Sequence, residues 1–181
     1  MEPFFSKTEI YFLPDEAAMT IKSMREFTTA YITNIFTEQP GAHIPPIFIG
    51  ATKNKQMFIA SMSSIMELPK DKFLSSALAI GKALVKQLDV NTCCFALESI
   101  TVNVKEGSEE HQKIISGDIL LKDHPNKEDK MICVYQRAGH YEVVHYDLNT
   151  VDNIKSLGKS MTLPDLPDNE GWNFFADQKV N

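Results

Sequence analysis

The sequence contains no long hydrophobic run and no excess of basic residues. No apolar stretch approaches the roughly 20 residues of a membrane-spanning helix, and the N-terminus lacks the basic region and apolar core of a secretory signal. The 181-residue chain has 18 Lys and Arg against 24 Asp and Glu, which gives a formal charge of −6. Binding to nucleic acid or anionic membranes depends on clustered basic residues. We therefore expect a soluble cytoplasmic protein without a membrane or nucleic-acid partner.

Cysteines and glycine-rich motifs are also scarce. The three cysteines, Cys93, Cys94 and Cys133, lie in apolar, strand-like runs. An odd number of cysteines in such positions favours reduced core thiols over a disulfide framework. The chain has no CxxC or HExxH pattern and no glycine-rich phosphate loop. We therefore expect no metal ion and no cofactor.

Two segments have the periodicity of amphipathic helices. Apolar residues recur at intervals of three and four in residues 15–39, and the same pattern fills residues 71–89. Asp71 is a suitable N-cap for the second segment. Gly81 lies on the apolar face of that segment, where a missing side chain favours close packing against a sheet.

Four short apolar runs indicate two β-hairpins. Residues 47–49 and 57–60 flank one polar turn, and residues 131–136 and 141–147 flank another. Between the hairpins, residues 93–104 form a long strand-like run.

The apolar positions of this long run change phase near Glu98 and Ser99, which predicts a β-bulge. The segment that follows, residues 105–117, is too polar for a core element and is expected to be an exposed excursion.

Hairpins separated by helices favour an α+β fold over a doubly wound parallel sheet. We predict a mainly antiparallel sheet of about five strands, two hairpins plus a central strand, with two helices packed on one face. Residues 1–150 would form this single domain, and residues 151–181 would form a C-terminal segment.

The C-terminal segment ends in an acidic tail with three aromatic residues, Trp172, Phe174 and Phe175. Exposed Trp and Phe side chains are common anchors at protein interfaces, so these three are candidate interaction residues. The alternative is that the tail docks on its own domain.

One polar group is a weak candidate for a catalytic site. Glu98 is a carboxylate in the middle of a strand, and Asp123 and His124 lie in the loop before the next strand, where they could converge with it. The simpler interpretation is that Glu98 marks the exposed face of its strand and that His124 is solvated.

Two of these stretches resemble a family of small uncharacterised phage and bacterial α+β proteins. The matching segments are Phe95 to Ile100, which has Glu98 but lacks the family's preceding Ser and its Trp, and Lys122 to Asp129, which retains His124-Pro125 and Lys127-Glu128. The resemblance implies a compact α+β domain and a viral or mobile-element origin, and it carries no catalytic residue.

Three classes of function follow as hypotheses. The first is a non-enzymatic protein that acts by protein binding or self-association, as a phage or mobile-element accessory factor that engages a host protein. The second is a small hydrolase or metal-dependent enzyme that uses Glu98, Asp123 and His124. The third is a sensor of a small ligand or nucleotide.

Overall fold

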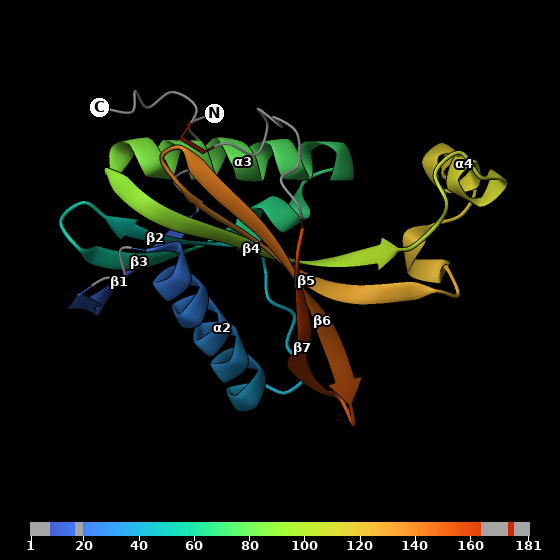
Figure 1. Ribbon diagram of the computed structural model, residues 1–181, viewed down its shortest axis with the longest axis horizontal. Coiled ribbons are helices and arrows are strands. Elements are labelled where there is room, and N and C mark those ends of the chain that lie inside the picture. Colours follow the sequence, from blue (N-terminus) through green and yellow to red (C-terminus); the bar gives the residue numbers. More distant parts are fainter. Residues whose placement is uncertain (1–7, 17–19, 164–173, 176–181) are drawn as a thin grey trace.

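In the residues that the computed structural model describes, which are 8–16, 20–163 and 174–175, seven strands form one antiparallel sheet (Figure 1). The strand order is β1-β3-β2-β4-β5-β6-β7. The strands are β1 (Glu9–Glu16), β2 (Ile47–Thr52), β3 (Gln56–Ser61), β4 (Val90–Val102), β5 (Lys127–Arg137), β6 (His140–Val151) and β7 (Ile154–Thr162). The α-helices are α2 (Ile21–Glu38), α3 (Lys70–Gln87) and α4 (Glu109–Ser116), and the 3-10 helices are η1 (Ser63–Glu67) and η2 (Leu121–Asp123). The α+β class is confirmed.

The two long helices lie on opposite faces of the sheet, with α3 above it and α2 below it in Figure 1. Met24, Ile32 and Phe36 of α2 belong to one buried cluster. Ala77 and Leu84 of α3 belong to the other. The prediction that both helices pack on one face is therefore wrong.

The central strands explain why both faces need a cover. All six residues of β2 are buried. Phe48 points into the α3 cluster and Ile49 into the α2 cluster, because neighbouring side chains of a strand point to opposite faces. A strand that is apolar on both faces must be buried on both.

A local signal fixes where α2 begins, whereas α3 begins after Pro69 without a side-chain cap, so the N-cap expected at Asp71 is wrong. Thr20 caps α2 through its side chain, which accepts a hydrogen bond from the Ser23 amide at 3.1 Å. On α3, a Cβ added to Gly81 would lie 2.5 Å from Cε1 of Phe174. The close approach expected at Gly81 is therefore present, and its partners include a residue of the C-terminal segment.

Two strands and one α-helix were not predicted, namely β1, β7 and α4, and neither were the short 3-10 helices η1 and η2. The strands β1 and β7 are the two edges of the sheet, and most residues of β7 are exposed or half-buried. The helix α4 lies within the polar segment expected as an exposed excursion, and none of its described residues is buried. An element that buries little apolar surface leaves a weak pattern in the sequence.

The predicted bulge in β4 is also wrong. Residues of β4 pair with β5 without interruption, from Thr92 opposite Arg137 to Val102 opposite Lys127. The apolar phase changes because the strand leaves the body of the protein near Leu97. The outer half of β4 (residues 97–102) and the paired part of β5 (residues 127–132) project together, with α4 and η2 at their end. We call this projection the arm, and it is visible at the right of Figure 1.

Among the helices within the described ranges, none is both long and apolar enough to cross a membrane.

Candidate functional site: a groove beside the β4–β5 arm

The arm begins where β4 loses one of its two neighbouring strands. The first residue of β2, Ile47, is paired with Ala96, so residues 97–102 of β4 have a described partner strand only on the β5 side. Pro45 and Pro46 precede β2, and proline has no amide hydrogen with which to continue the pairing. The two prolines therefore help to end β2 where the arm starts.

A buried histidine holds the end of the arm together. Nδ1 of His124 accepts a hydrogen bond from the Asn126 amide at 3.1 Å, which leaves Nε2 to donate to Oε1 of Glu110 at 2.9 Å. The His124 side chain is only 1% exposed. It therefore ties α4, through Glu110, to the segment that leads into β5.

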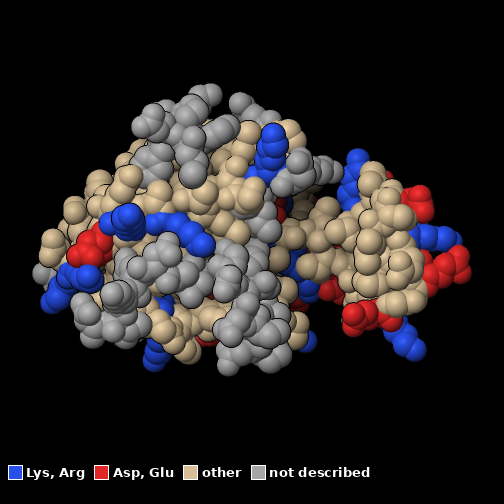
Figure 2. Space-filling model, turned by 90° about the horizontal axis from the view of Figure 1, so that it is seen from above, with Lys and Arg blue, Asp and Glu red and all other residues tan. Residues whose placement is uncertain are grey.

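An apolar groove of about 1080 Å³ lies between the body and the arm. Figure 2 shows the corresponding hollow, with a mainly uncharged surface on the arm side. The apolar lining residues from the body are Ile44, Pro45, Pro46, Met66, Phe73, Leu97 and Leu148. Those from the arm are Ile100, Ile114, Ile119, Leu120 and Leu121. Most of this lining was not singled out from the sequence, although the run Ile119 to Leu121 is an apolar signal inside a polar region.

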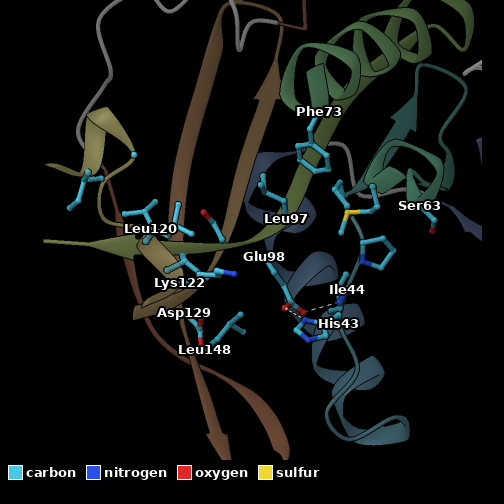
Figure 3. Close-up of a pocket in the computed structure, with 18 of the residues that line it drawn as sticks. His43, Ile44, Ser63, Phe73, Leu97, Glu98, Leu120, Lys122, Asp129 and Leu148 are labelled. Carbon is cyan, nitrogen blue, oxygen red and sulfur yellow. Dashed lines mark hydrogen bonds and ion pairs between the residues drawn. The ribbon is translucent and has the colours of Figure 1, made fainter. Parts of the chain in front are cut away.

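Glu98 lies at the rim of the groove, in a network of hydrogen bonds that Figure 3 shows in part. Its Oε1 accepts from the Ile44 amide at 2.8 Å, and its Oε2 lies 2.8 Å from Nζ of Lys155 and 3.0 Å from Nδ1 of His43. The side chains of Glu98 and Lys155 are 17% and 11% exposed. The network joins the loop before β2 to β4 and β7.

The pKa of Glu98 reflects two opposing effects. Partial burial raises it, but the Ile44 amide, Lys155 and His43 stabilise the ionised carboxylate and together outweigh burial, so the pKa lies below its ordinary value. The carboxylate is therefore charged at neutral pH, with both oxygens already engaged.

The three residues of the predicted catalytic group belong to separate environments. Glu98 contacts the α2–β2 loop and β7, whereas His124 contacts Glu110 at the end of the arm. Asp123 is exposed in η2. No hydrogen bond or ion pair recorded for the described part of the chain links any two of these three.

The aromatic tail places two of its side chains in the core. Phe174 and Phe175 are 3% and 5% exposed and belong to the cluster on the α3 face. The ring of Phe174 meets that of Phe48 edge to face at 5.5 Å between centroids, and its amide donates to Oε1 of Gln136 at 2.8 Å. This is the arrangement in which the tail docks on its own domain. Trp172 lies outside the described residues.

The cysteines and the acidic residues form no metal centre in the ranges for which the structure gives positions. Cys93, Cys94 and Cys133 are buried free thiols. Burial raises the pKa of the Cys93 thiol, and it does the same for Cys94. Such thiols stay protonated and unreactive at neutral pH.

Comparison with known proteins found no matching family model, no matching curated protein and no matching solved structure.

Replacing His124 with alanine is expected to loosen the arm while the body stays folded. The tip of the arm, residues 103–126, contains α4 and η2, whose described residues include none that is buried. The contacts of His124 therefore supply much of the stability of the tip. We expect amide exchange in α4 to accelerate by about tenfold or more, which corresponds to a loss of roughly 1.4 kcal/mol. Hydrogen exchange followed by mass spectrometry would measure this change.

The control for this experiment is His140→Ala, which removes an exposed histidine at the start of β6. It should leave exchange in α4 unchanged. We expect the tip to open without unfolding of the body. A cooperative loss of protection from hydrogen exchange in α2 and α3 after His124→Ala would contradict this expectation.

Proposed function

We propose that the protein acts by binding another polypeptide in the groove between the body and the arm, without catalysis. The observation that carries this proposal is exposed apolar surface inside a concave site. Met66, Leu120 and Leu121 line the groove and are 59%, 46% and 40% exposed. Covering apolar surface contributes roughly 25 cal/mol per Å², so a partner that fills the groove gains free energy from these side chains.

The charged groups of the groove also favour binding over catalysis. Glu98 already accepts hydrogen bonds at both oxygens. The remaining charged lining residues, Lys122 and Asp129, are exposed. General acid–base catalysis works best with a group whose pKa lies near the working pH, and the pKa of Glu98 is shifted downward, away from neutral pH. The mainly apolar lining likewise gives little support to a nucleotide sensor.

Self-association is the other form of binding considered from the sequence, and the dimer measurement given below distinguishes it from the binding of a different protein. The resemblance to small phage and bacterial proteins fits an accessory factor that engages a host protein.

The proposal is tested by selecting partners from a library of random peptides about eight residues long, which is long enough for a typical strand of about five or six residues or for two helical turns. We expect selected peptides to bind the wild-type protein and to lose at least about tenfold in affinity for Leu121→Lys, because a lysine there would have to be buried in an apolar contact. Fluorescence anisotropy of the labelled peptide would give the two dissociation constants.

The matched control is Val151→Lys, which introduces the same charge at an apolar residue that is 67% exposed at the end of β6, away from the groove lining. Peptides that bind the wild type, Leu121→Lys and Val151→Lys equally well would overturn the proposal, as would a selection that yields no groove-dependent binder.

A further inference from the structure

The floor of the groove contains an unpaired strand edge. Residues 97–102 of β4 pair with residues 127–132 of β5 on one side, and no described strand pairs with them on the other. In an antiparallel strand, the amide and carbonyl groups of alternate residues point to alternate sides. Residues 97–100 of this stretch line the groove, and every second one of them therefore directs a donor and an acceptor into it.

The apolar walls of the groove lie on both faces of this strand. Phe73 and Leu97 pack with the cluster on the α3 face, whereas Ile44 and Leu148 belong to the cluster on the α2 face. Figure 3 shows Phe73 and Leu97 on one side of β4, and Glu98, His43 and Leu148 on the other. The groove thus continues around the edge of the sheet.

This geometry suits one kind of secondary structure. An extended segment sends alternate side chains to the two faces of a sheet, while a helix presents its apolar residues as one stripe. Only an extended segment can fill both walls and also satisfy the backbone groups of β4. Addition of a strand to an open sheet edge is an established mode of peptide recognition.

This inference rests on the function proposed above. We propose that the occupant of the groove is an extended, apolar and nearly uncharged segment of a different protein, which adds to the sheet beside residues 97–102 of β4. This segment takes the position beside β4 that β2 would occupy if β2 began several residues before Ile47.

The charges of the groove set the chemistry of this segment. Lys122 and Asp129 have opposite charges, and the charge of Glu98 is offset by Lys155. The lining therefore has little net charge, so a segment with apolar side chains at alternate positions and no net charge complements it.

A second copy of the same chain is a poorer occupant. Its own unpaired β4 edge lies in the same recess, between a body and an arm, so two such edges cannot approach each other while both arms stand beside them.

The test is hydrogen exchange of wild-type protein with and without the tightest-binding selected peptide. Amides at alternate residues within 97–102 should exchange at least about tenfold more slowly in the complex, because they become hydrogen-bonded. Amides of β1, an edge strand that contributes no residue to the groove lining, serve as the internal control and should not change. A series of peptides, each N-methylated at one position, should lose affinity with a period of two residues.

Each outcome separates this inference from the proposed function. A peptide that needs Leu121 for binding but leaves the β4 amides unprotected, or whose N-methyl series has a period of three to four residues, overturns the strand and leaves the binding function standing. Failure to obtain any groove-dependent peptide overturns both. The occupant is a second copy if native mass spectrometry of the wild type shows a dimer that is absent in Leu121→Lys, and if hydrogen exchange shows that this dimer protects the same amides.

Discussion

Replacing Phe174 with alanine is expected to lower the free energy of unfolding by about 3–5 kcal/mol, the range observed for large aromatic residues removed from cores. The ring is packed between α3 and the sheet, against Gly81, Phe48 and Phe95. Removing it leaves a cavity that a glycine on α3 cannot fill. Urea denaturation followed by circular dichroism would measure the change.

The control for Phe174 is Val151→Ala, an apolar truncation at a position that is 67% exposed. We expect it to stay within about 0.5 kcal/mol of the wild type, as surface substitutions usually do. An unchanged stability in Phe174→Ala would instead mean that the tail leaves the core in solution. Phe174 would then be available to a partner, which is the interaction role considered from the sequence.

Replacing Glu98 with glutamine is expected to destabilise the protein by about 1–3 kcal/mol at pH 7 and by much less in acid. The glutamine can still accept from the Ile44 amide, but Lys155, which is 11% exposed, loses its counter-charge. Because the folded protein lowers the pKa of Glu98, the carboxylate contributes its stability above the ordinary glutamate range. That contribution is lost as the pH falls through the lowered pKa.

The measurement is the difference in unfolding free energy between wild type and Glu98→Gln at pH 7 and at about pH 3, below the ordinary glutamate value. The matched control is Glu128→Gln, since Glu128 is 59% exposed and its partner Lys130 keeps Asp147. We expect a change below about 1 kcal/mol for this control. A difference for Glu98→Gln that grows as the pH falls would contradict the sign of the pKa shift.

Much of the fold could be predicted because its central elements bury regular apolar patterns. The two long helices, the two hairpins and the central strand all occur, with shifted ends. The prediction that both helices pack on one face was wrong. The apolar run of β2 requires cover on both faces of the sheet, but it was interpreted only as a sign of a strand. The edge strand β7 gave no clear pattern because most of its residues are exposed or half-buried.

The candidate site was less accessible to sequence reasoning. Glu98 was singled out as a mid-strand carboxylate that either faces water or has a partner, and the simpler interpretation, an exposed position, is wrong because its side chain is only 17% exposed and has three partners. That reasoning could not identify Ile44, His43 and Lys155, since they lie 54, 55 and 57 residues away in the chain. The groove depends on the absence of a strand beside residues 97–102, and such an absence follows only from the register of β2 against β4.

One half of β4 is buried in the body and the other half forms part of the arm, and this difference determines where the chain tolerates insertions and deletions. Inside the body, successive residues such as Cys93 and Cys94 serve different clusters. Deleting one residue there would exchange the two sets of side chains and move the Glu98 carboxylate toward the opposite layer. At the tip, the single buried side chain in residues 103–126 is that of His124. Insertions and deletions between related proteins should therefore be confined to the tip, where the groove can be widened or narrowed while both layers of the body stay intact.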